Sequence, residues 1–314
     1  MIELNKIYEG NCLDLFKKLD NESIDCVITS PPYWQLRDYK WDGQWGLEPT
    51  FQLYLEHLWE MMDEVYRVLK PTGTAWINLG DTYGTKSGNF SDQVNCGSYK
   101  HKIDYVGGIS NYTKPDNLHK CLLLIPHRFA IGCIDRGWIM RNDIVWAKRN
   151  GMPESVTDRL SKKHEYFFFM AKSEKYYFDL DGIKDRTKTK DLSNRNRDET
   201  KLNNTPCRTK MAGLKTNSYD TKNPGSVSDF WDIPTKPSSD EHYAAYNDSL
   251  IGKPIVAGCP PSGIVLDPFC GTATTGCRAL ELGRNFIGFE GSAKFVDIGN
   301  KNLHPFLIQK QLFP

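Results

Sequence analysis

Short hydrophobic runs alternate along this chain with segments whose hydrophobic positions recur every three or four residues. The run at 24–29 (IDCVIT) is largely apolar and favours β structure, which predicts a strand buried inside a parallel sheet. Between residues 50 and 69 the hydrophobic positions share one helical stripe, and Pro71 and Gly73 follow as stop signals. A long helix is therefore expected directly before the next strand.

The same patterns predict elements along most of the chain. The predicted strands are 5–9, 24–29, 74–79, 139–148, 165–172, 264–266 and 286–289. The predicted helices are 12–19, 50–69, 125–136 and 274–282. Strands that alternate with helices predict an α/β fold, with a doubly wound, mostly parallel sheet covered on both faces.

Two segments show no such pattern. Residues 84–118 are rich in Gly, Ser, Asn and Tyr, which predicts a long loop whose role the sequence does not indicate. Residues 184–222 contain eleven lysines and arginines, five acidic residues and almost no aliphatic side chains. This composition fits either a flexible surface insertion or an element that contacts DNA.

The overall composition is that of an ordinary globular protein, with 39% hydrophobic and 25% charged residues among 314. The net charge of +1 means that any basic surface must be local. The nine cysteines form no CxxC pair, so no metal site is expected and the thiols are expected to be reduced. With neither a signal-peptide pattern nor a membrane-length apolar run, we expect a cytoplasmic enzyme.

The segment VLDPFCGTATTGCRALELGRNFIGFE (265–290) has the layout of a nucleotide-binding βαβ unit. A strand leads to Asp267, and a turn at Gly271 lets the backbone approach a ligand closely before a helix begins. Glu290 ends the next strand, where it can accept hydrogen bonds from two ribose hydroxyls. The turn lacks the GxGxxG pattern of dinucleotide sites, which argues against hydride transfer.

This segment resembles the S-adenosylmethionine-binding motif of amino-group DNA methyltransferases, usually DPFxGSGTT. The resemblance implies a seven-stranded, Rossmann-like methyltransferase sheet. It also implies that Phe269 lies against the cofactor and that the turn with Thr272 and Thr274 surrounds its methionine carboxylate. Ala273 stands where the family commonly has glycine.

Two weaker matches flank this motif. HYAAYNDSL (242–250) is similar to a family segment that supports the methionine end of the cofactor, which implies a role for His242. Asn247 replaces the usual proline, although asparagine is itself a good helix N-cap. YEGNC is similar to a Gly-Asp segment that contacts the adenine amino group, with Asn11 in place of the aspartate.

The motif TSPPYW (29–34) follows a predicted parallel strand, at the sheet edge where α/β proteins bind ligands. Methyl transfer to an exocyclic amine needs acceptors for both N–H protons, and the Ser30 hydroxyl and Pro31 carbonyl suit this role. Pro31 and Pro32 restrict the backbone, and Tyr33 offers a face on which a flipped base can stack. No covalent nucleophile is required.

In the family, a serine at the first position of this motif goes mainly with N4-cytosine methylation and an aspartate mainly with N6-adenine methylation. Ser30 therefore favours cytosine, and adenine stays open as the alternative. A methyltransferase for a non-DNA substrate would not need this motif. A catalytically silent DNA-binding module would not need intact Ser30–Tyr33 and Asp267–Gly271 segments.

The catalytic motif precedes the cofactor motif, an order that resembles the circularly permuted β group. Two further segments, LGDTY (79–83) and 146–168, resemble family regions. The resemblance implies a catalytic half (1–183), a target-recognition insertion (184–238) and a cofactor half (239–314). Duplex DNA is the implied substrate, whereas a cognate restriction endonuclease and a homodimer stay open. The basic side chains expected to contact DNA are Lys188, Lys190, Arg195 and Arg197.

Overall fold

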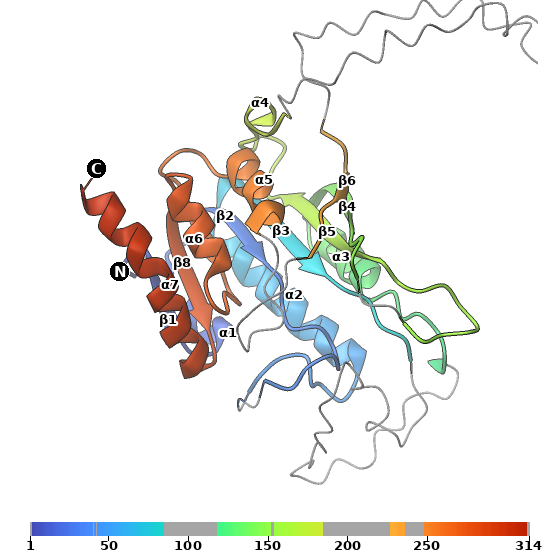
Figure 1. Ribbon diagram of the computed structural model, residues 1–314. Coiled ribbons are helices and arrows are strands. Elements are labelled where there is room, and N and C mark those ends of the chain that lie inside the picture. Colours follow the sequence, from blue (N-terminus) through green and yellow to red (C-terminus); the bar gives the residue numbers. More distant parts are fainter. Residues whose placement is uncertain are drawn as a thin grey trace, which may run out of the picture. The chain divides into compact units, whose positions relative to one another are not determined.

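One mixed sheet organises the computed structural model, which describes residues 2–39, 41, 43–84, 118–151, 154–184, 227–235 and 248–312 (Figure 1). Its strand order is β1-β8-β7-β2-β3-β5-β4-β6. The strands are β1 (Lys6–Glu9), β2 (Ile24–Thr29), β3 (Leu69–Leu79), β4 (Ile139–Ala147), β5 (His164–Ala171), β6 (Phe230–Asp232), β7 (Ile264–Asp267) and β8 (Asn285–Glu290). The seven predicted strands are all present, and β6 is an additional one within the segment 184–238.

The strand directions bring the two sequence motifs together. Strands β1, β8, β7, β2 and β3 run parallel, so their carboxyl ends share one edge of the sheet. From β2 the chain proceeds to β3 on one side, and from β7 it proceeds to β8 on the other. The neighbouring ends of β2 and β7 therefore form a topological switch point, where doubly wound sheets bind their ligands.

Helices cover both faces of the sheet, as the predicted doubly wound fold requires (Figure 1). One face carries α1 (Cys12–Phe16), α2 (Phe51–Val68) and α3 (Ile125–Asp135). The other carries α5 (Asp248–Gly258), α6 (Thr274–Glu281) and α7 (Ala293–Leu312). Residues 180–228 form a second compact unit, whose described part includes the short helix α4 (Leu180–Ile183).

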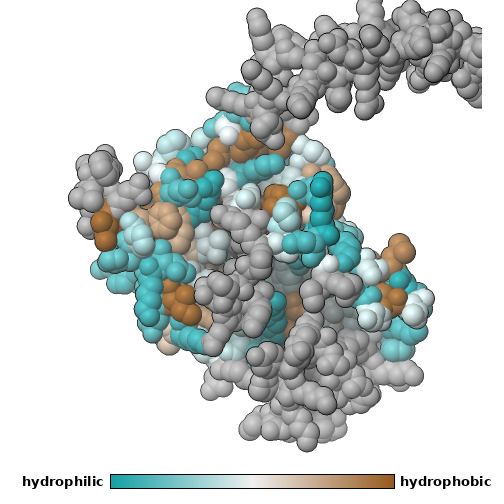
Figure 2. Space-filling view, viewed as in Figure 1, coloured by the Kyte–Doolittle hydropathy of each residue, from teal (hydrophilic) through white to brown (hydrophobic). Residues whose placement is uncertain are grey.

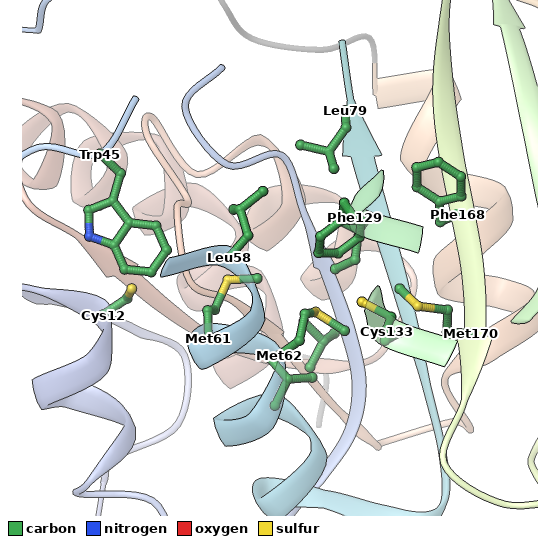
Figure 3. Close-up of a cluster of buried hydrophobic side chains, with 14 of the residues drawn as sticks. Cys12, Trp45, Leu58, Met61, Met62, Leu79, Phe129, Cys133, Phe168 and Met170 are labelled. Carbon is green, nitrogen blue, oxygen red and sulfur yellow. The ribbon is translucent and has the colours of Figure 1, made fainter. Parts of the chain in front are cut away.

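The core between the sheet and α2 explains why this helix forms where it does. Met61 and Val65 of its predicted stripe are fully enclosed, whereas Leu53 and His57 at its start are only half-buried. The Thr50 hydroxyl caps the helix by accepting from the Leu53 N–H at 3.2 Å. Figure 3 shows Met61 and Met62 of α2 in one buried cluster with Phe129 of α3 and Phe168 of β5. Burial of this continuous apolar stripe fixes the helix across the sheet.

The boundaries differ from the predicted ones where tertiary contacts extend an element. Strand β3 begins at Leu69, immediately after α2, so Pro71 and Gly73 lie inside the strand instead of in a turn. The twenty-residue helix α7, with Pro305 inside it, was not predicted.

The described surface gives no indication of a membrane span. No helix in the described residues is both long and apolar enough to cross a bilayer. In the view of Figure 2, hydrophilic and hydrophobic side chains intermingle over the coloured surface.

Candidate active site

A cavity of about 750 Å³ opens at the carboxyl ends of β2, β7 and β8, where the two motifs meet. This volume is typical of a small-molecule or cofactor site. The predicted residues that line it are Asn11, Ser30, Pro31, Pro32, Tyr33, Asp267, Phe269, Gly271, Thr272, Thr274 and Glu290. His242, Lys188, Lys190, Arg195 and Arg197 lie outside the described residues.

Asp267 is the structural link between the two motifs. Its side chain is 1% exposed, and its two carboxylate oxygens accept hydrogen bonds at 2.6 Å from the hydroxyls of Thr29 and Thr275. The Phe269 N–H also donates to it at 3.1 Å. A buried carboxylate needs such donors to offset its lost hydration. Asp267 therefore ties the end of β2 to the turn that enters α6.

Glu290 closes the same turn from the neighbouring strand. Its carboxylate accepts from the backbone N–H groups of Gly271 and Ser292, both at 2.9 Å. Burial raises the pKa of Glu290 above its ordinary value, although these backbone donors oppose the shift. Each carboxylate oxygen has a second lone pair, so the side chain can still accept from a ligand.

The turn into α6 has an unusual backbone at Ala273. This residue adopts φ 69°, in the left-handed region that glycine adopts more readily, and it gives α6 no side-chain cap. The strain costs roughly 1 kcal/mol, which is a physical reason for the glycine that related motifs carry here. The uncapped first turn leaves backbone N–H groups suited to an anionic ligand group.

Asn11 lines the cavity but already has a structural partner. Its Oδ1 accepts from the Leu13 N–H at 2.9 Å and so caps α1. The second lone pair of this oxygen and the amide N–H₂ are the groups that this side chain can offer a ligand.

The segment after TSPPYW forms an aromatic wall that the sequence motifs did not predict. The Trp45 ring lies 5.2 Å from the Phe269 ring, measured between centroids. A Cβ at Gly291 would lie 2.5 Å from the Trp41 ring, so only glycine permits this contact. The loop that supports both tryptophans is held by Glu48, which accepts from the Gly46 N–H at 2.9 Å.

The backbone of the TSPPYW motif is held from α2. The hydroxyl of Tyr54, a fully buried residue of that helix, donates to the Pro32 carbonyl at 2.8 Å. Pro31 and Pro32 themselves restrict the backbone torsions. The segment is therefore rigid before any substrate arrives, as a site that must orient a reacting group requires.

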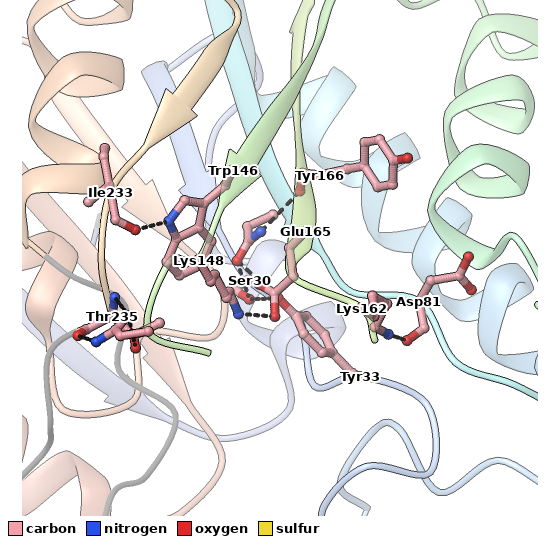
Figure 4. Close-up of polar contacts among 12 residues, drawn as sticks. Ser30, Tyr33, Asp81, Trp146, Lys148, Lys162, Glu165, Tyr166, Ile233 and Thr235 are labelled. Atoms are coloured by element: carbon pink, nitrogen blue, oxygen red, sulfur yellow. Dashed lines mark hydrogen bonds and ion pairs between the residues drawn. The ribbon is translucent and has the colours of Figure 1, made fainter. Parts of the chain in front are cut away.

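The side chains of this motif belong to a polar network (Figure 4). Ser30 Oγ lies 3.4 Å from both Tyr33 Oη and Asn78 Oδ1. Tyr33 Oη lies 3.0 Å from Asn78 Oδ1 and donates to Glu165 Oε2 at 2.8 Å, while Lys148 pairs with the other Glu165 oxygen. Burial, and then the charge of Glu165, raise the pKa of Tyr33 well above its ordinary value, so its hydroxyl keeps its proton.

Comparison with known proteins agrees with this geometry. Residues 24–301 match the family model described as DNA methylase, which covers N6 and N4 enzymes. The chain belongs to this family of DNA methylases.

The type II methyltransferases M.Cfr9I of Citrobacter freundii and M.SmaI of Serratia marcescens are each 34% identical to the chain. The alignments cover 96% of this chain and 89% of M.Cfr9I, and 95% of this chain and 90% of M.SmaI.

Solved structures share the fold of this DNA methylase. PvuII DNA methyltransferase (cytosine-N4-specific) superposes with a TM-score of 0.61 at 18% identity, covering 96% of this chain and 89% of that one. The M1.HpyAVI–SAM complex superposes with a TM-score of 0.53 at 19% identity, covering 95% of this chain and 98% of that one. The predicted methyltransferase sheet is thus confirmed.

Sequence reasoning missed several polar residues of this DNA methylase site. Asn78 is the next-to-last residue of β3, and Lys148 follows β4. Glu165 lies at the beginning of β5, which runs antiparallel to β3, so its first residues reach the same edge as the carboxyl ends of the parallel strands. The segments 79–83 and 146–168 resemble family regions, but only the antiparallel pairing shows that Glu165 enters the site.

Proposed function

We propose that this DNA methylase transfers a methyl group from S-adenosylmethionine to N4 of cytosine in duplex DNA. The observation that carries the proposal is the placement of the Ser30 hydroxyl and the Glu290 carboxylate on one cavity at the switch point of the sheet. The structural likeness to a cytosine-N4-specific methyltransferase supports the choice of base. N6 of adenine is the alternative acceptor.

The residues of the cavity fit the proposed cofactor. Glu290 has acceptor capacity for ribose hydroxyls, and the uncapped start of α6 beside Thr272 and Thr274 offers donors to a carboxylate. Phe269 and Asn11 line the same cavity. We propose that Phe269 lies against the cofactor and that Asn11 contacts its adenine amino group. When bound, the sulfonium supplies an electrophilic methyl group.

The TSPPYW segment provides the groups that the target amine needs. Ser30 Oγ and the Pro31 carbonyl accept the amine protons, which favours the pyramidal nitrogen and the positive charge that develops on it. The Tyr33 ring provides a stacking surface, held in place because its hydroxyl is bonded to Glu165. A Cβ at Gly80 would lie 2.5 Å from Cε2 of Tyr33, so glycine there makes room for this ring.

Mass spectrometry of nucleosides tests the proposal directly. Unmethylated bacterial DNA, copied by polymerase chain reaction, is incubated with the protein and S-adenosylmethionine and then digested. We expect N4-methylcytosine. N6-methyladenine would overturn the choice of base and leave methyl transfer to DNA intact, whereas methylation of free nucleosides but not of DNA would indicate a different substrate class.

Cofactor binding is expected to weaken on acidification because Glu290 must be ionised to accept two ribose hydroxyls. Since burial raises the pKa of Glu290, the loss should begin at a higher pH than for an ordinary glutamate and be complete below the folded-state pKa. Calorimetric titration with S-adenosylmethionine across pH measures this. The variant Glu290→Gln should bind S-adenosylmethionine more weakly at neutral pH, and its affinity should not fall further at low pH. If the variant still lost affinity at low pH as the wild type does, another group would be responsible for the pH dependence.

The enzyme is also proposed to act in the cytoplasm.

We propose further that the basic stretch of residues 184–222 contacts DNA. Reversing the charge at Arg195 and Arg197 should weaken binding to a duplex oligonucleotide by about tenfold or more, because each lost phosphate contact removes part of the counterion-release free energy. The affinity for S-adenosylmethionine should stay the same. Charge reversal at the exposed Lys17 and Lys18, which do not line the cavity, is the matched control. Equal loss of DNA affinity in both variants would contradict a specific role for the basic stretch.

A further inference from the structure

Two hydroxyl groups connect the proposed amine site to a carboxylate. Ser30 Oγ donates to Tyr33 Oη at 3.4 Å, and Tyr33 Oη donates to Glu165 Oε2 at 2.8 Å. Figure 4 shows these side chains converging from the ends of different strands. Asn78 Oδ1 is a second acceptor within reach of both hydroxyls, at 3.4 Å from Ser30 Oγ and 3.0 Å from Tyr33 Oη. When Ser30 donates to Tyr33 and Tyr33 donates to Glu165, the hydrogen bonds lead from the cavity towards Glu165.

Methylation of an exocyclic amine leaves one proton too many on the nitrogen, and this proton must be removed. Ser30 can receive it only if its hydroxyl passes its own proton on, because a protonated hydroxyl is far too acidic to persist. A positioned carboxylate is a suitable final acceptor.

The described residues that line the cavity include three carboxylates, and two are committed elsewhere. Asp267 is 1% exposed and holds two hydroxyls and a backbone N–H. Glu290 holds the N–H groups of Gly271 and Ser292. Glu165 is the one of the three whose hydrogen-bonding partner, Tyr33, is itself bonded to Ser30.

We propose that Glu165 is the final acceptor of the proton released by the methylated amine, acting through the hydroxyls of Tyr33 and Ser30. The bond between methyl carbon and sulfur breaks as the carbon–nitrogen bond forms, and sulfur keeps the electron pair. The amine proton passes to Ser30 Oγ, the Ser30 proton to Tyr33 Oη and the Tyr33 proton to Glu165. The products are the methylated base, the neutral thioether and a protonated Glu165 that returns its proton to solvent.

The role of Glu165 rests on the proposed function, in which Ser30 Oγ contacts the target amine. It applies equally whether that amine belongs to cytosine or to adenine. Both amines release one proton on methylation. The experiments below therefore measure total methyl incorporation into DNA, which does not depend on which base is modified.

The charges around Glu165 suit this role. Lys148 pairs with its Oε1 and packs against the Trp146 ring at 4.3 Å from the centroid, and Lys162, from the loop before β5, also acts electrostatically on Glu165. Both cations offset the negative charge that the Glu165 carboxylate carries before transfer. The raised pKa of Tyr33 means that its hydroxyl passes a proton on without becoming a stable anion.

The variant Glu165→Gln tests the proposal, since its amide oxygen can still accept from Tyr33 but cannot take up a proton. The rate constant for single-turnover methylation of unmethylated bacterial DNA should fall about 100-fold. Dissociation constants for S-adenosylmethionine and DNA should change less than threefold. The wild-type rate should decline at acid pH, and this decline should be absent from the variant.

Two further variants separate proton transfer from loss of structure. Tyr33→Phe keeps the ring and interrupts the connection, so it should slow methyl transfer about as much, and the double variant should be little slower than either single one. Glu154→Gln is the control, because Glu154 pairs with Arg159 in the same β4–β5 connection without lining the cavity.

Three results would overturn the role of Glu165. These are a Glu165→Gln rate within threefold of wild type, an acid decline that persists in that variant, and multiplicative losses in the double variant. If Glu165→Gln fails to fold, the pH–rate profile of Tyr33→Phe decides alone: retention of the wild-type acid decline would show that the carboxylate does not act through Tyr33.

Discussion

Replacing Asp267 with asparagine is expected to destabilise the protein by roughly 3 kcal/mol and to weaken binding of S-adenosylmethionine at least tenfold. The carboxylate accepts from Thr29, Thr275 and the Phe269 N–H, so an amide nitrogen would point a donor at a donor. The turn that these bonds hold lines the cavity, which couples stability to binding. Urea unfolding and calorimetric titration measure the two effects.

Asp14→Asn is the matched control. Asp14 lies on the surface and pairs with Lys17, so its replacement should leave both the unfolding midpoint and cofactor affinity unchanged. An Asp267→Asn protein that loses stability but binds the cofactor normally would show that the turn keeps its geometry without the carboxylate.

Replacing Ser30 with alanine is expected to lower the single-turnover rate of DNA methylation by 10²–10³-fold, the usual effect of removing one preorganised polar group from a reacting centre. The reason is that the amine loses the acceptor that favours its developing positive charge. Cofactor affinity should be unaffected, because Ser30 bonds to Tyr33 and Asn78 and not to the Asp267 turn. Rapid-quench measurement with tritiated methyl donor provides the rate.

Ser23 offers a control at the opposite end of the same strand. It precedes β2, and its hydroxyl donates to the Asp20 carbonyl at 2.7 Å, away from the cavity. Ser23→Ala should methylate DNA at the wild-type rate. A Ser30→Ala enzyme that does the same would leave the Pro31 carbonyl as the sole candidate acceptor on this segment.

Much of the fold could be predicted because most elements bury a regular apolar pattern. Strand β2 has the predicted bounds, and α2 differs from the prediction by one residue at each end. The apolar run of β2 is typical of a buried strand, and the hydrophobic spacing of α2 is typical of an amphipathic helix. Strand β6 has only three residues and forms by pairing with β4, a contact distant in sequence that no local pattern contains. Helix α7 contains Pro305, which masks a helical pattern.

The candidate site was predictable where function imposes a contiguous motif. TSPPYW and the 265–290 segment each combine a strand end with residues whose chemistry serves a ligand, and both line the cavity. The roles within them were less predictable. Asp267 lines the cavity as predicted, and its oxygens also accept from Thr29 and Thr275, a structural role that the motif alone does not reveal. Burial and hydrogen-bond partners reveal such a structural role, and both depend on distant residues.

By itself, the sequence determined the strand-and-helix order, the two motifs and their family, because local periodicity and short spacings encode these features. Only the tertiary structure decided that Glu165 meets Tyr33 across 132 positions and that Lys148 meets Glu165. The physical reason is the antiparallel β5, which brings its first residues to the carboxyl edge of the parallel strands. Strand pairing between distant segments therefore placed a carboxylate behind the motif.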